Sequence, residues 1–508
     1  MNLTNSHLQH TLISGTIGYG KTEAAMAMNV PRMFTPNPPA FVWLDQPGSM
    51  AEKVEKHCVY HGLHVSDPST LIVDPIAETS GVPGYSTCEG SMNPDPDQRD
   101  AEDRESISDT KALLVYDEGK LDTSQNPNTD RGLDDALLLF IRQKSPVPFT
   151  ELWKCFNPLH DAHHMFLRNC TDPELIMRFF WYSRLSPRER EYHCGAAERR
   201  LRKVADSPQF KKRCLATFNL ADFLNRGGRL IGNGASRGNL SRRDVRLIFS
   251  IIILRVIQLA RSGKLKRRVV VVIDEGLATG LIERNLIRAM MECRKWGLEF
   301  VIILQDPMTL PEDIRDNLFH LCSRQFIFRQ NSPKAASLSA DIVATPNLDP
   351  HKIKVTEYFK RIVDLGTEEI PTESTTWWID KDGNRHESKH SGSTFRNIRG
   401  EETDSRDIHY SFYEQQKLKE QIIRRLGVGR CFIVDGNIVS EDPVYIPMLP
   451  EPWTTADGPL IFDTASGQTL ANKKLDDARK LMKQRPEYQT PNVVMPCNRK
   501  KELDLGME

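Results

Sequence analysis

Several hallmarks of common protein classes are missing from this 508-residue chain. Its ten cysteines form no C-x-x-C pair and show no metal-ligand spacing, which argues against a disulfide framework or a zinc module. The N-terminus lacks a secretory signal pattern, and the longest apolar run, Leu247 to Ala260, is too short to span a membrane and contains Arg255. We therefore expect reduced thiols, a cytoplasmic location and no membrane span.

A net charge of either sign is also missing, because 68 Lys and Arg balance 68 Asp and Glu. The total charge thus gives no sign of a nucleic-acid partner. The distribution is uneven, however. Residues 184–268 hold 22 basic against 6 acidic side chains (22 − 6 = +16), whereas residues 77–109 hold 2 against 9 (2 − 9 = −7). The first segment is suited to phosphate, and the second would repel it.

Strand-like apolar runs alternate with helical segments in two parts of the chain, which predicts an α/β fold with a mostly parallel sheet. Two insertions separate these parts: an acidic one poor in large apolar residues, and one whose apolar residues recur at helical spacing. Turn signatures in TTWWIDKDGNRHES and GRCFIVDGNIVSED predict β hairpins further on. The predicted segments are 1–76 and 206–350 (the two parts of the α/β domain), 77–110 (mobile acidic insertion), 111–205 (all-helical insert), 351–451 (β-rich extension) and 452–508 (tail).

A glycine-rich stretch, GTIGYGKT from Gly15 to Thr22, satisfies G-x-x-x-x-G-K-[ST] between an expected strand and an expected helix. In this pattern backbone N–H groups approach phosphates, Lys21 reaches the β and γ phosphates, and Thr22 binds Mg²⁺. A random chain of this length contains the pattern roughly 2% of the time, so we interpret the stretch as a P-loop for ATP and Mg²⁺. The predicted nucleotide-binding residues are Gly15, Gly18, Gly20, Lys21, Thr22 and Glu23.

Hydrolysis also needs a carboxylate on the metal side and a group that activates water. The run RVVVVIDEG predicts a buried strand with Asp274 and Glu275 at its carboxyl end, where ligands of α/β sheets bind. We predict that Asp274 holds Mg²⁺ through water and that Glu275 polarises the attacking water. Gln305, at the end of LEFVIILQ, is predicted to contact the γ phosphate or its water, although an ordinary strand terminus explains it more simply when it is taken alone.

Four stretches share a combined pattern: HLQHTLISGTIGYGKT, WLDQPGS, VVVVIDEG and ECRKWGLEFVIILQDPMTLPEDIRDNLFHLCSRQFIFR. Together they resemble the HerA and FtsK superfamily of DNA-pumping ATPases, which includes the conjugative coupling proteins. The P-loop alone is generic, and the block from Arg-Lys-x-Gly to Gln-x-Pro is the specific part. The resemblance covers roughly residues 8–76 and 215–335.

This resemblance implies a RecA-like domain in a homohexameric ring that hydrolyses ATP to move double-stranded DNA. It also implies that ATP lies between subunits and that an arginine of a neighbour completes the site. Arg294 is the first candidate for that catalytic arginine and Arg329 the second. A structural ion pair is the alternative for either residue.

DNA contact would come from local basic loops, SRGNLSRRDVR and KLKRR. Solvated faces that balance the acidic insertion are the alternative. A different class of function also fits: an ATP-gated ring scaffold that assembles a partner effector, such as a nuclease in a defence complex. A packaging or secretion motor for a protein substrate is a third alternative.

Two further clusters have ordinary interpretations. The histidines of HDAHH, His160, His163 and His164, lack a suitable partner at zinc spacing, so a metal site is the less favoured interpretation. Trp377 and Trp378 could stack on nucleic acid, but we expect them to cover a small sheet.

Overall fold

The computed structural model describes residues 9–63, 68–73, 88, 90–91, 93–116, 127–145, 147–206, 218–235, 242–275, 284–450, 452, 454–455, 458–459, 462–463 and 468–488. The chain divides into two compact units. The first combines Met1–Ser339 with Ile422–Glu508, and the second is Ala340–Gln421.

A mostly parallel sheet is the centre of the first unit. Its strand order is β11-β10-β7-β1-β6-β5-β2-β4-β3, with β12 paired to β10. All pairs from β7 to β3 are parallel, and β10 runs antiparallel to β7. The strands are β1 Thr11–Ser14, β2 Ala40–Asp45, β3 Thr70–Val73, β4 Arg229–Asn233, β5 Val269–Asp274, β6 Leu298–Leu304, β7 Arg324–Ile327, β10 Arg430–Asp435, β11 Ile438–Val439 and β12 Val444–Tyr445. This arrangement confirms the predicted α/β fold class.

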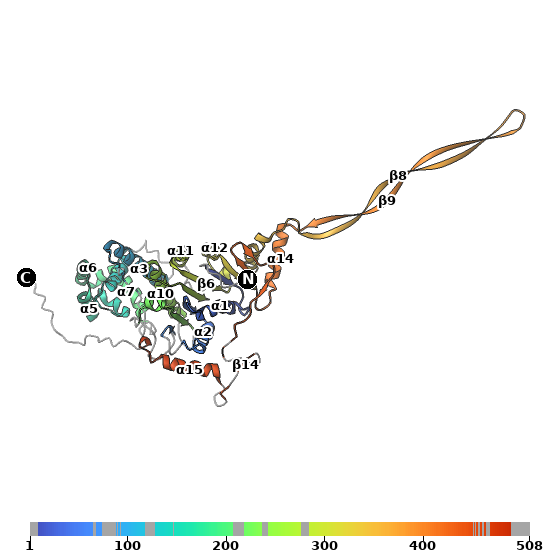
Figure 1. Ribbon diagram of the computed structural model, residues 1–508. Helices are drawn as coiled ribbons and strands as arrows, with labels where there is room; N and C mark the ends of the chain where they lie inside the picture. The colour runs from blue at the N-terminus through green and yellow to red at the C-terminus, as the bar shows by residue number, and fades with distance from the viewer. Residues whose placement is uncertain are drawn as a thin grey trace, which may run out of the picture. The chain divides into compact units, whose positions relative to one another are not determined.

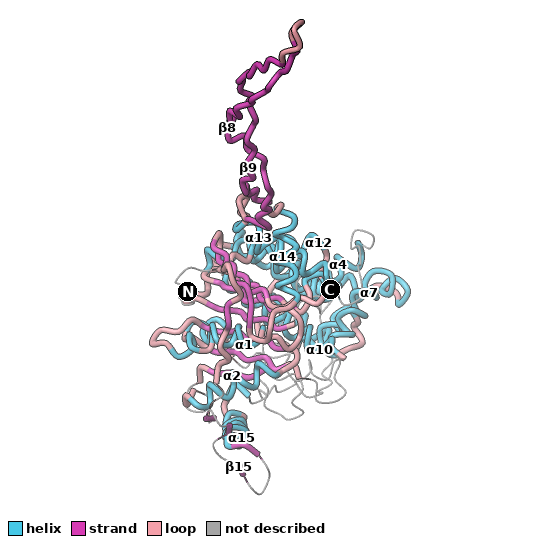
Figure 2. Tube along the Cα trace, turned by 90° about the vertical axis from the view of Figure 1, so that its right-hand side faces the viewer, coloured by secondary structure: helices cyan, strands magenta, loops and turns pink. Residues whose placement is uncertain are grey.

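Helices lie on both sides of these strands (Figures 1 and 2). Those nearest the sheet in sequence are α1 Lys21–Asn29, α2 Ser49–Tyr60, α9 Leu220–Asn225, α10 Arg242–Arg261, α11 Arg284–Cys293, α12 Glu312–Leu321 and α13 Pro333–Ala344. A helical region between β3 and α9 contains α3 Pro96–Tyr116, α4 Pro127–Ile141, α5 Asp161–Asn169, α6 Pro173–Arg184 and α7 Pro187–Ala205. Within the described residues, no helix is both long and apolar enough to cross a lipid bilayer.

The buried core explains why the central strands are continuous apolar runs in the sequence. Every residue from Val269 to Ile273 is at most 1% exposed, because helices cover both faces of a parallel sheet. Trp43 and Phe300 on neighbouring strands are fully buried beside them. Burial of apolar side chains contributes about 25 cal/mol per Å², so these strands form a rigid base for the loops at their carboxyl ends.

The predicted mobile insertion over 77–110 is wrong for its described second half. Residues from Pro96 onward form α3, and Ile107 packs into the core. Arginines distant in sequence pair with its carboxylates: Arg142, which follows α4, pairs with Asp100, and Arg261 of α10 lies 3.5 Å from Asp109. Local composition could not reveal these partners. Residues 74–87 of the same stretch lie outside the described part of the chain.

The predicted β-rich extension over 351–451 is not one unit. The hairpin GRCFIVDGNIVSED is confirmed as β10 and β11, but β10 joins the central sheet through β7. The predicted tail contains helix α15 Leu470–Met482, which packs on α2. Arg479 of α15 pairs with buried Glu55, and the Tyr488 hydroxyl accepts a 2.6 Å hydrogen bond from the Ile72 N–H. The described tail therefore covers the free edge of β3.

The second unit is a long antiparallel ribbon of β8 Ile353–Ile379 and β9 Arg385–His409. Flanking residues belong to α13 and to α14 Phe412–Arg424. The Asp-Gly-Asn turn predicted from the sequence joins the two strands and is confirmed. No third strand from the described residues joins this two-stranded sheet, and Trp377 and Trp378 are 50% and 53% exposed. The expectation that they cover a small sheet is therefore wrong.

Candidate nucleotide site

The glycine-rich loop lies at the carboxyl end of the sheet, between the last residue of β1 and the first residue of α1. Gly20 has φ 98°, a left-handed conformation that favours glycine, and it precedes the first helical residue, Lys21. A Cβ on Gly15 would lie 2.6 Å from the Phe328 Cβ, so the loop passes too close to β7 for a side chain there. Gly18 also has a left-handed φ, of 83°, so local geometry explains all three predicted glycines.

Lys21 points back into its own loop. Its Nζ donates a 3.0 Å hydrogen bond to the Thr16 carbonyl, and the residue is 6% exposed. Burial lowers the pKa of Lys21, and the nearby carboxylates of Asp274 and Glu275 oppose that shift. The ammonium therefore lies within the field of both predicted acidic residues.

The loop and the acidic strand meet although 252 positions separate them in sequence. Thr22 Oγ1 donates a 3.1 Å hydrogen bond to Asp274 Oδ2. Asp274 is the last residue of β5, which is separated from β1 only by β6. Burial raises the pKa of Asp274 to about 7, with further contributions from the charges of Asp45 and Glu275.

Glu275 follows Asp274 in a conformation that few side chains adopt. Its φ of 54° is the only positive value at a non-glycine residue among those described, and such a conformation costs about 1 to 3 kcal/mol. The Gln305 Nε2 donates a hydrogen bond to Glu275 Oε1. The two predicted catalytic side chains at the tips of β5 and β6 are therefore in direct contact.

Asp45 is a site residue that the sequence analysis did not assign. It ends β2, in register with Asp274 on β5, and it is fully buried. Its Oδ2 accepts a 2.8 Å hydrogen bond from the Ala51 N–H, and burial raises its pKa. A signal existed, because AFVWLD ends in an aspartate as RVVVVID does.

The oxygen groups of this site suit Mg²⁺. Mg²⁺ prefers oxygen ligands, and few of them need come from the protein. Asp45 Oδ1 is buried without a hydrogen-bond partner, and Asp274 lies beside it on the next strand. Two buried carboxylates repel each other, and a divalent cation removes that repulsion. Thr22 and Asp274 would hold the ion, with Asp45 behind them.

The remaining predicted residues are placed differently. Glu23 forms an ion pair with Lys53 of α2, so its side chain has a partner within the protein. The side chain of Arg294 lies outside the described part of the chain. Arg329 contacts the P-loop of its own chain: its Nη1 donates a 2.6 Å hydrogen bond to the Tyr19 hydroxyl, and its guanidinium lies 5.0 Å from that ring's centroid.

Some basic and histidine residues already have structural partners. Arg268 forms a 2.9 Å ion pair with Glu299, and Arg267 donates to the Pro38 carbonyl. His163 Nδ1 lies at hydrogen-bond distance from the Cys155 carbonyl, and His164 Nε2 from the Pro158 carbonyl. In the described part of the chain, no group of three or more histidine, cysteine or acidic side chains is placed to hold a metal ion by itself. The seven cysteines whose side chains are described form no disulfide and are buried.

Comparison with known proteins gives structural likenesses only. No protein-family model matches the chain, and no curated protein matches it. The plasmid coupling protein TrwB with a non-hydrolysable ATP analogue is 14% identical, with TM-score 0.48, over 89% of this chain and 88% of that one. TrwB with ADP and Mg²⁺ is also 14% identical, with TM-score 0.46 over the same shares. VirB4 of Thermoanaerobacter pseudethanolicus is 12% identical, with TM-score 0.48, over 89% of this chain and 91% of that one.

Proposed function

We propose that this protein is a Mg²⁺-dependent ATPase whose hydrolysis moves double-stranded DNA through a homohexameric ring. In this proposal the P-loop binds the phosphates, Thr22 and Asp274 hold Mg²⁺, and Glu275 activates water. Gln305 orients Glu275, and an arginine of a neighbouring subunit, with Arg294 as the candidate, stabilises the transferred phosphoryl group.

One observation supports the proposal above all others. The hydroxyl of Thr22 and the carboxylate of Asp274 lie 3.1 Å apart, and Glu275 with its partner Gln305 follows at the same edge of the sheet. In the proposal these residues are a phosphate-binding loop, two groups for Mg²⁺ and a carboxylate for water, which is the set of parts that phosphoryl transfer requires.

DNA-stimulated hydrolysis tests the motor part of the proposal. Arg242 and Arg243 begin α10 in the basic segment, whereas Arg267 and Arg268 are needed for structural contacts. We therefore expect the double variant Arg242→Gln and Arg243→Gln to keep its basal ATPase rate and lose at least about half of the stimulation by duplex DNA at low salt. The measurement is phosphate release with and without DNA at two salt concentrations.

A matched control removes the same charge elsewhere. Lys474→Gln with Lys480→Gln on α15 changes two exposed cations outside the basic segment and should keep full stimulation. Equal hydrolysis with and without DNA in the wild-type protein would contradict the motor and favour the scaffold. In that case a ring that assembles only with ATP, seen by negative-stain microscopy, would support an ATP-gated assembly around an effector.

Arg329 gives a prediction about the P-loop itself. Tyr19→Phe removes the hydroxyl that accepts from Arg329, and a hydrogen bond with a charged partner contributes about 1.5 to 3 kcal/mol. We expect Tyr19→Phe and Arg329→Gln each to weaken ATP binding by about tenfold, with the double variant no weaker than either single one. Titration with a fluorescent ATP analogue measures all three affinities, and additive losses would show that the two residues act separately.

Mixed oligomers decide whether Arg329 also acts on a neighbour. Arg329→Gln subunits keep Lys21, and Lys21→Ala subunits keep Arg329. At an ATP concentration where Arg329→Gln alone hydrolyses little ATP, a catalytic arginine that acts on the neighbouring subunit would raise the ATPase activity of the mixture above the sum of the two separate proteins. Because Arg329 contacts Tyr19 of its own chain, we expect no recovery.

A further inference from the structure

The β8–β9 ribbon has no core of its own. Its two strands pair with each other from Ile353↔His409 to Ile379↔Arg385, and none of their residues is buried. Figures 1 and 2 show it as a twisted two-stranded ladder. A two-stranded hairpin alone is at best marginally stable in water, and each strand leaves one edge of backbone N–H and C=O groups unpaired. The ribbon therefore needs a partner.

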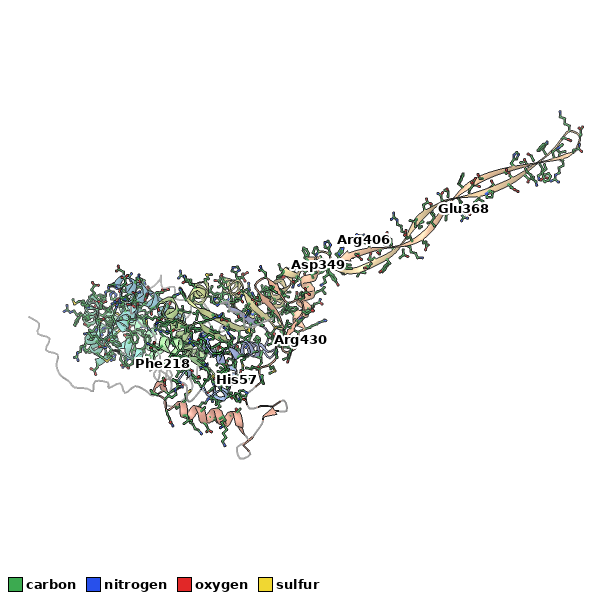
Figure 3. The ribbon with its side chains drawn as sticks, viewed as in Figure 1. His57, Phe218, Asp349, Glu368, Arg406 and Arg430 are labelled. Atoms are coloured by element: carbon green, nitrogen blue, oxygen red, sulfur yellow. The ribbon has the colours of Figure 1, made fainter. Side chains whose placement is uncertain are left out.

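Large apolar side chains along the ribbon indicate that this partner is a protein. Tyr358, Ile362 and Leu365 are 74%, 66% and 65% exposed on β8, and Phe395 is 68% exposed on β9. Isolated apolar residues on a surface are ordinary, but several exposed ones on a ribbon with two open strand edges favour strand addition. Figure 3 shows side chains projecting on both sides of the ribbon around Glu368 and Arg406.

The charge of the ribbon argues against DNA as that partner. Residues 353–409 contain 9 Lys and Arg and 12 Asp and Glu (9 − 12 = −3). Several of its cations lie opposite carboxylates of the other strand. The directly opposed pairs are Glu357↔Arg406, Arg361↔Glu402, Asp364↔Arg399 and Glu368↔Arg396. A surface that is net negative and internally paired repels a phosphate backbone.

The same charges favour a second copy of this chain. Residues 354–361 of β8 contain three cations and one carboxylate (3 − 1 = +2), and residues 401–407 of β9 contain one cation and four carboxylates (1 − 4 = −3). Pairing β8 with β8, or β9 with β9, would bring like charges together. Pairing β9 of one copy with β8 of another brings opposite charges together, and opposite-charge cross-strand pairs contribute about 0.2 to 1 kcal/mol each.

We propose that the ribbon binds a second copy of this chain edge to edge, with β9 of one copy antiparallel to β8 of the next. The contact uses the half of the ribbon that contains Ile353 and His409, away from the hairpin turn. In the register of the ribbon itself, Arg406 would lie between the Glu357 of its own chain and that of the other copy. The β8 segment from Val355 to Asp364 lies between the two irregularities of the ladder and contains no proline, so its edge is continuous. Such a contact uses two different surfaces, so it can repeat around a ring.

Disulfide cross-linking between two single-cysteine variants tests the pairing. One chain carries Glu357→Cys and the other Arg406→Cys, so no single chain can close this bridge. The seven described native cysteines are buried. Directly opposed strand residues have Cβ atoms about 4.5 to 5.5 Å apart, which is close to disulfide distance. We expect the mixture, under mild oxidation, to give a linked dimer that neither variant gives alone.

The matched control keeps Glu357→Cys and replaces its partner with Arg396→Cys, which lies opposite Glu368, about 36 Å further along the ribbon. This mixture should give no linked dimer. Equal yields in the two mixtures would overturn the proposal. Efficient linking of Glu357→Cys to itself would also overturn it, because that product requires β8 to meet β8.

A charge-reversal series gives a readout that needs no cysteine. Glu402→Lys with Asp404→Lys should weaken self-association, measured by sedimentation without nucleotide, by about tenfold. Adding Lys360→Glu and Arg361→Glu to the same chain should restore it, because opposite charges again face each other. A quadruple variant that stays as weak as the double variant would contradict the proposal. Since no nucleotide is present, the outcome does not depend on the proposed ATPase.

Discussion

Glu275→Gln is expected to keep ATP affinity within about threefold of the wild-type value and to lower turnover by about 100- to 10,000-fold, the usual contribution of a positioned general base. The amide keeps the shape of the side chain and a hydrogen bond with Gln305, but it cannot accept a proton from water. Binding is measured with a fluorescent ATP analogue and turnover by phosphate release.

A second variant that also replaces a carboxylate by an amide is the control for the loss of negative charge in Glu275→Gln. Glu312→Gln at the first residue of α12 alters a side chain that is 83% exposed and has no assigned role in the site, and it should leave both parameters unchanged. Hydrolysis by Glu275→Gln at the wild-type rate would remove Glu275 from its proposed role. The strained backbone at this residue predicts that Glu275→Gly stabilises the fold while abolishing turnover, which separates strain from catalysis.

Lys21→Ala is expected to weaken ATP binding by at least about 100-fold, which corresponds to about 3 kcal/mol, since truncating one partner of a buried charged contact costs about 2 to 5 kcal/mol. In the present structure Lys21 is nearly buried and donates to the Thr16 carbonyl. A bound triphosphate would replace that carbonyl as its partner. Loss of the ammonium therefore removes the main cation of the loop.

Two comparisons make the result specific. Lys21→Arg keeps the charge but not the compact ammonium. Its ATP affinity should lie between that of Lys21→Ala and that of the wild-type protein. Lys334→Ala removes an exposed cation from α13 and should bind ATP normally. Isothermal titration calorimetry gives the affinities, and thermal unfolding confirms that each variant is folded. Wild-type affinity in Lys21→Ala would show that this stretch is not a phosphate-binding loop.

The local sequence was sufficient to predict the strands, helices and turns that form the site. The alternation of apolar runs and helical segments predicted the α/β class, and the strand ending in Asp274 and Glu275 was visible because both faces of a parallel strand are buried. The hairpin turn at Asp380 to Asn384 followed from the turn preference of its Asp-Gly-Asn sequence. These features depend on residues that are neighbours in the sequence, so they can be predicted from composition and spacing.

Other features depend on partners distant in sequence. Asp45 was not assigned, because its importance comes from lying beside Asp274 on an adjacent strand. The stretch that forms α3 was predicted to be mobile, because its composition does not show that Arg142 and Arg261, distant in sequence, pair with its carboxylates. The contact of the tail with α2 was not predicted, because it depends on Arg479 reaching a buried carboxylate that is distant in sequence.

The amino-acid sequence by itself determined that a glycine loop and an acidic strand end exist, since each is encoded within about ten residues. Only the tertiary structure decided that Thr22 touches Asp274, that Gln305 touches Glu275 and that Arg329 faces its own P-loop. The physical reason is the strand order of the sheet. Residues 30 to 310 positions apart become neighbours when parallel strands align their carboxyl ends along one edge.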